Sequence, residues 1–268
     1  MFTRAIVRPP AANFAEGLTT ADLGTPDYER ALKRHEAYCR ALERCGLALT
    51  RLPPDPLHPD STFVEDTAVL TDKYAVLTRP GAPSRTGEVA SIKKVLTDSY
   101  SDILSIQPPG TVDGGDVCEA GEHFFIGLSE RTNETGAKQL ADLLAPFGYT
   151  SSFVHIRGLN GMESVPRAVA TGSVLHLKSG LAWLGDNRLV VIDELASRPE
   201  FSSYDLVRVN AGEAYAANCL RVNDHILVAQ GFPVLERELQ KLGYQTIALD
   251  TTEFQKMDGG LSCLSLRF

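Results

Sequence analysis

One pattern recurs along this sequence and constrains the fold more than any other feature. Each copy consists of an apolar strand, a short turn, a second apolar strand, a helix and a third strand. Four copies follow one another, with predicted strands and helices at 63–70, 74–78, 85–98 (helix) and 103–106; 112–117, 123–127, 134–147 (helix) and 152–156; 174–177, 188–192, 193–197 (short helix) and 206–209; and 218–222, 225–228, 233–242 (helix) and 246–249. Such internal repeats are typical of modular architectures, in which each unit buries its apolar face against its neighbours.

A fifth copy is divided between the two ends of the sequence. Its first strand is predicted at 261–266, its second at 5–7, its helix at 27–45 and its last strand at 47–52. Chain ends usually fray, but the last residues alternate Leu-Ser-Leu-Arg-Phe, as a half-buried strand does. For this copy to form, the ends must meet, so the repeats are expected to close into a ring.

Polar residues occupy the head of the first strand in every copy. They are Glu65 with Asp66, Asp113, His176, Asn218 and Cys263, at intervals of 42 to 63 residues. In a ring these positions converge on the axis. Carboxylates, an imidazole and a thiol are rarely buried together unless they take part in chemistry. Each residue alone has an ordinary explanation, such as a buried structural cysteine or a turn aspartate, and only their joint occurrence predicts a site.

Composition and charge restrict the class of partner. The chain has 268 residues, of which 43% are hydrophobic and 22% charged, and its formal net charge is −8. We expect neither nucleic acid nor a membrane as a partner, whereas a small cationic substrate suits this charge. No apolar stretch has the length of a membrane span or of a signal sequence.

The cysteines predict a reducing environment. There are five (Cys39, Cys45, Cys118, Cys219 and Cys263), an odd number without CxxC spacing. A disulfide framework or a structural zinc site is therefore not expected, and a cytoplasmic location fits best. We interpret Cys39, Cys45 and Cys118 as structural and leave the role of Cys219 open. No cofactor and no metal are predicted.

Five motifs in order resemble those of the dimethylarginine dimethylaminohydrolases, members of the guanidino-group-modifying or pentein superfamily. The motifs are Phe63-Val64-Glu65-Asp66, Asp113-Gly114-Gly115-Asp116, Leu175-His176-Leu177-Lys178, Ala217-Asn218-Cys219 and Asp258-Gly259-Gly260-Leu261-Ser262-Cys263. The resemblance covers essentially the whole chain. It implies a five-bladed α/β-propeller of ββαβ units, with fivefold pseudosymmetry, forming one domain over residues 1–268.

The resemblance also implies a reaction, the hydrolysis of asymmetric dimethylarginine and monomethylarginine to citrulline and dimethylamine or methylamine. Cys263 would attack the guanidinium carbon and form a covalent S-alkylthiouronium intermediate. His176 would act as general acid and then as general base. Asp113 would orient His176 and stabilise its cationic form.

Seven further positions match substrate contacts of the family: Leu18, Asp60, Glu65, Asp66, Arg85, Arg131 and Met257. Neighbouring residues of a strand point to opposite faces, so one of Glu65 and Asp66 is expected to face the substrate and the other to reach it indirectly. Under the resemblance, the closer contact with the reacting guanidinium is assigned to Asp66. Asp60 and the backbone carbonyl of Leu18 would hold the α-amino group or cover the substrate as a lid. Arg85 and Arg131 would bind the α-carboxylate, and the backbone at Met257 would add a contact.

One segment departs from the family pattern. Residues 157–170 form an unusually long connection, which we interpret as a surface loop. The oligomeric state, monomer or homodimer, is left open.

Alternative functions remain at this stage. An arginine deiminase or another guanidine hydrolase would use similar groups, but deiminases carry an Asp two residues after the histidine, where this chain has Lys178. A catalytically inactive binding propeller is disfavoured by the intact set Cys263, His176 and Asp113. Zinc bound adventitiously by Cys263 and His176 would inhibit.

Overall fold

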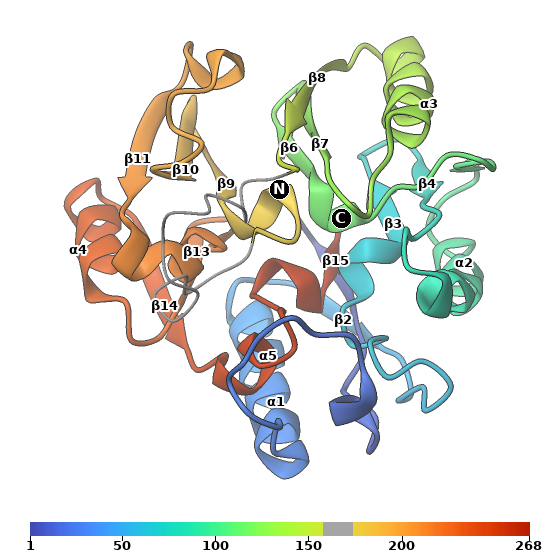
Figure 1. Ribbon diagram of the computed structural model, residues 1–268, viewed down its shortest axis with the longest axis horizontal. Coiled ribbons are helices and arrows are strands. Elements are labelled where there is room, and N and C mark those ends of the chain that lie inside the picture. Colours follow the sequence, from blue (N-terminus) through green and yellow to red (C-terminus); the bar gives the residue numbers. More distant parts are fainter. Residues whose placement is uncertain (158–173) are drawn as a thin grey trace.

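The computed structural model describes residues 1–157 and 174–268 and shows five small sheets arranged around a central axis (Figure 1). Each sheet has three strands. In sequence order of their inner strands, the sheets are β3 (Ala68–Leu70), β4 (Ala75–Leu77) and β5 (Ile103–Ser105); β6 (Val117–Ala120), β7 (His123–Leu128) and β8 (Thr150–His155); β9 (Leu181–Gly185), β10 (Arg188–Ile192) and β11 (Asp205–Val209); β12 (Leu220–Val222), β13 (His225–Ala229) and β14 (Gln245–Leu249); and β15 (Leu266–Arg267), β1 (Arg4–Val7) and β2 (Ala48–Arg51).

All five sheets have the same internal topology. The middle strand pairs antiparallel with the inner strand and parallel with the outer one. A parallel pair needs a crossover connection, and in four blades it contains a helix at the periphery (Figure 1). These helices are α1 (Tyr28–Arg44), α2 (Val89–Leu96), α3 (Glu134–Leu144) and α4 (Pro233–Lys241), and a short helix, α5 (Thr252–Gln255), precedes the last inner strand. The predicted five-bladed α/β-propeller is confirmed.

The divided blade closes the ring as predicted. β15 pairs with β1 through Ala5–Arg267 and Ile6–Leu266. The carbonyl of Phe268 accepts hydrogen bonds from the N–H groups of Thr3, at 2.9 Å, and Arg4, at 2.8 Å. The two chain ends therefore share one sheet, and the C-terminal strand is ordered because it completes this blade.

Sequence pattern explains how each blade packs. The middle strands read as continuous apolar runs because both of their faces are covered, and β10 is buried from Leu189 to Ile192. The outer helices are amphipathic and bury one face each. In α1 this face carries Ala31, Tyr38 and Leu42, and the helix begins where the Asp27 side chain accepts a hydrogen bond from the Arg30 N–H.

The predicted inner strands were wrong in their positions. The strand predicted at 174–177 lies instead at 181–185, and the other four begin two to five residues later than predicted. The polar residues predicted to begin these strands, called anchor residues below, lie in or directly beside 3₁₀ turns. The turns are η2 (Val64–Thr67), η4 (Gly114–Asp116), η6 (Leu177–Ser179), η8 (Ala211–Ala217) and η9 (Ser262–Leu264). The strands begin only afterwards. The turns are closed by backbone hydrogen bonds across three residues, for example from the Asp116 N–H to the Asp113 carbonyl at 3.0 Å.

Two helix predictions also need correction. Residues 193–197 form turns rather than a helix, and the 3₁₀ turn η7 (Pro199–Phe201) follows them. The helix predicted at 85–98 begins as the 3₁₀ turn η3 (Pro83–Glu88), because Pro83 fixes the first turn, and continues as α2. The predicted loop at 157–170 lies almost entirely outside the described residues. Within the described ranges, no helix has the length and apolarity needed to cross a bilayer.

Candidate active site

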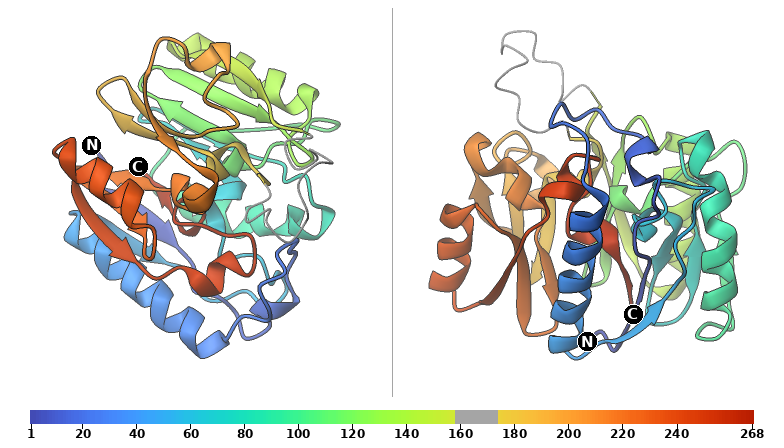
Figure 2. Two further views of the ribbon diagram at one scale, coloured as in Figure 1. Left: turned by 60° about the vertical axis from the view of Figure 1, so that its left-hand side comes forward. Right: turned by 90° about the horizontal axis from the view of Figure 1, so that it is seen from below.

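A small pocket at one end of the ring gathers most of the predicted site residues. Its lining consists of Leu18, Asp60, Phe63, Asp66, Arg85, Arg131, Leu175, His176, Met257, Asp258, Gly259 and Cys263. Its volume is about 30 Å³. The segment after β1 crosses this end of the molecule, whereas both chain ends lie at the opposite end (Figure 2, right).

His176 and Asp113 form a fixed pair beside the pocket. The distance from His176 Nε2 to Asp113 Oδ2 is 2.9 Å, and the other Asp113 oxygen accepts a hydrogen bond from the Gly81 N–H at 2.8 Å. Asp113 is fully buried. Burial opposes the imidazolium, but the carboxylates of Asp66, Asp116 and Asp113 outweigh it and raise the pKa of His176 to about 9. The imidazole is therefore predominantly cationic at neutral pH, with Nδ1 as the nitrogen not bound to Asp113.

The turn that follows His176 is held from the second blade. The Leu177 N–H donates to Asp116 Oδ1 at 2.9 Å, and the other Asp116 oxygen accepts from the hydroxyls of Ser129 and Thr132, each at 2.6 Å. Burial raises the pKa of Asp116 to about 6 in spite of these hydrogen bonds. Asp116 thus fixes the backbone next to the imidazole, a role that the sequence analysis missed although the residue belongs to a quoted motif.

Cys263 lies on the 3₁₀ turn η9 and is partly exposed to the pocket. Its sulfur accepts a hydrogen bond from the Gly260 N–H at 3.4 Å. Burial, together with the carboxylates of Glu65 and Asp66, raises the pKa of the Cys263 thiol to about 12. The neighbouring Gly259 allows a close approach, because a Cβ there would overlap the ring of Phe63. The thiol is therefore neutral at neutral pH in the free protein.

Asp66 connects the pocket to a buried arginine. One of its oxygens accepts from the Gly115 N–H at 2.8 Å, and the other from Arg85 Nη1 at 2.5 Å. Burial favours the neutral acid, but the cations of His176 and Arg85 outweigh it and lower the pKa of Asp66 to about 2. Asp66 is thus a carboxylate at every physiological pH, aimed at the pocket.

Most N–H groups of the Arg85 guanidinium are already hydrogen-bonded within the protein, which was not predicted. Glu88 Oε1 accepts from its Nε at 2.9 Å, Glu88 Oε2 from Nη2 at 2.8 Å, and the Phe63 carbonyl also from Nη2 at 3.0 Å. With the bond to Asp66, this leaves one Nη1 N–H without a partner among the described residues. Arg85 lines the pocket but does not present a free guanidinium fork. Glu88 was not among the predicted residues, although its (i, i+3) spacing from Arg85 was a usable signal.

Arg131 presents the more available cation. Its backbone N–H donates to Ser129 Oγ at 2.9 Å, while its guanidinium makes no hydrogen bond within residues 1–157 and 174–268. The close packing of its backbone against Gly81, where a Cβ would overlap the Arg131 carbonyl, fixes the base of this side chain. The pocket therefore has carboxylates and guanidinium groups on its wall.

The segment around Leu18 covers the pocket. The Leu18 N–H donates to both oxygens of Asp60, at 3.0 and 3.2 Å, and the Thr20 N–H donates to Asp258 Oδ2 at 2.6 Å. Leu18 itself is 43% exposed. Met257, next to Asp258, is buried in the pocket wall. The Thr19 hydroxyl also donates to the Lys256 carbonyl at 2.9 Å, so hydrogen bonds to the 256–258 turn and to Asp60 hold this segment over the pocket.

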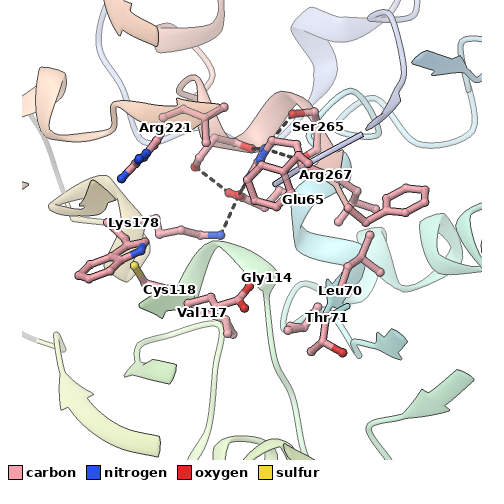
Figure 3. A pocket seen from close by; sticks show the side chains of 18 of the residues that line it. Glu65, Leu70, Thr71, Gly114, Val117, Cys118, Lys178, Arg221, Ser265 and Arg267 are labelled. Atoms are coloured by element: carbon pink, nitrogen blue, oxygen red, sulfur yellow. Dashed lines mark hydrogen bonds and ion pairs between the residues drawn. The ribbon is translucent and has the colours of Figure 1, made fainter. Parts of the chain in front are cut away.

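Glu65 lies elsewhere. It lines a second, larger cavity of about 960 Å³ (Figure 3) and not the small pocket. Lys178 Nζ, at 2.7 Å, and Arg267 Nη2, at 3.2 Å, approach Glu65 Oε1, and the Ser262 hydroxyl donates to Oε2 at 2.7 Å. Glu65 and Asp66 do point in different directions as predicted, although from a 3₁₀ turn rather than a strand. The structure does not bring Glu65 into contact with the pocket, and its link to Cys263 runs through Ser262.

One group among the described residues could approach a metal ion. Ligand atoms of Asp66, Asp113 and His176 all lie within 4.8 Å of one another. Both carboxylates already accept backbone or side-chain hydrogen bonds, and the Arg85 guanidinium bonded to Asp66 would repel a divalent cation. The group is better suited to holding a protonated imidazole.

Fold and pocket together define a class of protein, the pentein-type α/β-propeller with a cysteine, a histidine and carboxylates at one end of the ring. The same fold occurs in the N-terminal domain of ArgZ, an arginine dihydrolase from cyanobacteria, with a TM-score of 0.84 at 18% identity, over 100% of this chain and 97% of that one. No protein-family model matches the sequence.

Sequence similarity then gives the family. The chain is 42% identical to the N(G),N(G)-dimethylarginine dimethylaminohydrolase of Pseudomonas aeruginosa over 269 aligned residues, covering 100% of both. A solved structure of the Pseudomonas protein, a cysteine-to-serine mutant complexed with citrulline, matches with a TM-score of 0.92 over 100% of both chains. The chain belongs to the dimethylarginine dimethylaminohydrolase family, and the resemblance of its motifs is confirmed.

Proposed function

We propose that this protein hydrolyses asymmetric dimethylarginine and monomethylarginine to citrulline and dimethylamine or methylamine. The observation that carries the proposal is one pocket in which the Cys263 thiol, the His176 imidazole paired with Asp113 and the Asp66 carboxylate meet. The family relationship supports the same reaction, because the Pseudomonas relative was solved with citrulline bound.

The reaction proceeds in two halves. The Cys263 sulfur forms a bond to the guanidinium carbon, the bond from that carbon to the methylated nitrogen breaks, and His176 gives its proton to the departing amine. The intermediate is a covalent S-alkylthiouronium. His176 then takes one proton from a water molecule, whose oxygen bonds to the same carbon. The carbon–sulfur bond breaks, and the second proton of that water is lost to solvent as the carbonyl of citrulline forms. Citrulline leaves and the thiolate is restored.

Activation of Cys263 depends on the substrate. The thiol has a pKa of about 12 in the free protein, so very little thiolate exists at neutral pH. A guanidinium placed between Cys263 and Asp66 adds a positive charge next to the sulfur and neutralises the field of the carboxylate. Both effects lower the pKa of the thiol, and its proton leaves to solvent.

Binding uses the charged wall of the pocket. Asp66 accepts hydrogen bonds from the guanidinium, and Asp60 with the Leu18 carbonyl holds the α-amino group. Arg131, assisted by the remaining Nη1 N–H of Arg85, binds the α-carboxylate, and the backbone at Met257 adds a contact. Since the pocket holds about 30 Å³, the Leu18 segment must open for entry and close again over the substrate.

Two further assignments accompany this function. We propose that residues 1–268 act as one propeller domain, because the blade that closes the ring uses both ends of the sequence. We also propose a cytoplasmic location, supported by five free cysteines.

The test is a citrulline assay on the purified protein with asymmetric dimethylarginine, monomethylarginine and arginine. We expect citrulline from both methylated substrates and little from arginine. Cys263→Ser is expected to abolish turnover, whereas Cys39→Ser, a buried cysteine of α1, serves as the matched control and keeps it. Absence of citrulline from the methylated substrates, or arginine as the best substrate, contradicts the proposal and in the latter case favours a deiminase.

A further inference from the structure

Asn218 occupies a special position in the fourth blade. In the other four blades, the equivalent position carries a residue that lines the small pocket or is bonded to one that does. It follows η8, precedes β12 and is 93% buried. It does not line the small pocket. Nothing in the proposed reaction uses this residue, although its place in the ring is equivalent to those of His176 and Cys263.

The Asn218 side chain joins two segments that are far apart in sequence. Its Nδ2 donates to the Lys178 carbonyl at 2.8 Å, and that carbonyl lies two residues after His176. The same nitrogen donates to Ser262 Oγ at 3.0 Å, and Oδ1 accepts from the Ser262 N–H at 3.0 Å. Ser262 directly precedes Cys263. One amide is therefore bonded to both the histidine turn and the cysteine turn.

These bonds require an amide. The Ser262 N–H can only donate and the Lys178 carbonyl can only accept, so the side chain between them must present an acceptor and a donor together. Among side chains of this length, only asparagine does so. Packing adds a further restriction, since a Cβ at Gly260 would lie 2.5 Å from Asn218 Oδ1. The Gly260 N–H also donates to the Cys263 sulfur. The Asn218 side chain therefore supports the backbone that hydrogen-bonds to the thiol.

We infer that Asn218 is a positioning residue that fixes Cys263 relative to His176. The inference rests on the proposed function for its kinetic consequence but not for its geometry. A displacement of about 1 Å between reacting groups can lower the rate about 100-fold. Because Asn218 touches neither the pocket nor the substrate, its loss leaves substrate binding largely intact.

The test compares Asn218→Ala with Asn223→Ala. Asn223 is a matched control from the same blade, since its side chain also bridges backbone groups, those of Phe2 and Cys45, but away from the pocket. We expect Asn218→Ala to lower kcat about 10- to 100-fold with KM changed less than threefold, and Asn223→Ala to change kcat less than threefold. A kcat of Asn218→Ala within threefold of wild type, or a loss confined to KM, overturns the inference.

A second measurement does not depend on turnover. Iodoacetamide labelling of Cys263, followed by peptide mass spectrometry between pH 7 and 10, is expected to be at least threefold slower in Asn218→Ala at each pH, because the hydrogen bond from Gly260 to the sulfur is loosened. Unchanged labelling overturns the inference even if no substrate is turned over, which separates it from failure of the proposed function. If Asn218→Ala does not fold, Asn218→Ser, which keeps a polar side chain but cannot present the amide's acceptor and donor to both turns at once, is judged by the same criteria.

Discussion

At the scale of single residues, three titrating groups set the chemistry of the pocket. Asp66, with a pKa of about 2, is anionic; His176, with a pKa of about 9, is cationic; and Cys263, with a pKa of about 12, is neutral. At neutral pH His176, the proposed general acid, is already protonated, whereas Cys263, the proposed nucleophile, is not yet a thiolate. In the proposed reaction the free protein is therefore protected against unselective attack by Cys263, and the cationic substrate supplies the missing charge.

The reactivity of Cys263 should follow this charge state. Only the thiolate reacts with iodoacetamide, and below the pKa its fraction rises tenfold with each pH unit. We expect the labelling rate of Cys263 to increase continuously from pH 7 to pH 10, measured by mass spectrometry of the Cys263 peptide. Cys263→Ser gives the background from the four buried cysteines. A plateau already reached at pH 8 would contradict the high thiol pKa.

Asp113→Asn tests the imidazole pair. The substitution keeps a hydrogen-bond acceptor for Nε2 but removes the negative charge, so the pKa of His176 should fall from about 9 towards its ordinary value. We expect kcat to drop roughly 100- to 10,000-fold, as for other acid–base groups and their orienting carboxylates. The alkaline limb of the kcat profile should also move to lower pH.

The control for Asp113→Asn is Asp193→Asn, which removes a carboxylate paired with Arg208 on the surface. It is expected to leave both kcat and the pH profile unchanged, because exposed ion pairs contribute little. A pH profile of Asp113→Asn that coincides with wild type would show that Asp113 does not set the charge of His176.

At the scale of elements, the 3₁₀ turns explain what the sequence could and could not predict. Apolar residues alternate around His176 and Ser262, and this alternation predicted strands there. A tight turn that leads into a strand produces the same pattern over three or four residues, so the boundary was misplaced. The anchor residues nevertheless lie at equivalent places in the five blades, in or beside these turns, because the repeat spacing depends on the blades and not on the local conformation of each turn.

The sequence could not predict which side chains from different blades would form hydrogen bonds or ion pairs with one another. Glu65 bonds to Ser262, 197 residues away, and to Lys178. Such contacts depend on how the ring closes and on the direction in which each side chain points from its turn. For the same reason Glu65 was expected near the substrate with Asp66, whereas it turns towards the larger cavity.

The segment that covers the pocket can be tested at Gly17. A Cβ at this position would overlap Asp60 Oδ1 and lie 3.2 Å from Met257 Cε. Gly17→Ala should therefore displace Asp60 from the Leu18 N–H and hold the segment partly open. We expect kcat/KM for monomethylarginine to fall about tenfold, with the melting temperature within a few degrees of wild type because Asp60 can rotate.

Gly212→Ala is the matched control for this change. Its Cβ would meet only the Asn210 side chain, at 3.2 Å, on a surface turn away from the pocket. We expect steady-state kinetics of this variant to equal wild type. An unchanged kcat/KM in Gly17→Ala would show that the Leu18 segment does not limit access to the pocket.

At the scale of the whole molecule, different cavities lie at the two ends of the axis of the ring. The small pocket lies at one end. Glu65, Lys178 and Ser262 line the cavity of about 960 Å³ and not the small pocket, and Figure 3 shows Glu65 and Lys178 in that cavity. The chain ends also lie on the side away from the pocket (Figure 2). Closure of the ring is thus achieved without placing a chain end in the site.

This arrangement predicts that the present chain ends can be joined and new ends opened elsewhere in the ring. Thr3 and Arg4 bond to the Phe268 carbonyl, so a short Gly/Ser linker can join Phe268 to Met1 without strain. New ends between Gly121 and Glu122 would open the exposed turn of the β6–β7 hairpin, where chain breaks are usually tolerated. We expect this circular permutant to fold and to retain kcat within tenfold of wild type, measured by circular dichroism and the citrulline assay.

A permutant opened between Asp258 and Gly259 is the comparison, because both residues line the pocket, and it should lose at least 100-fold in kcat. An unfolded Gly121–Glu122 permutant would mean that the covalent order of the divided blade, and not only its pairing, is needed to close the ring.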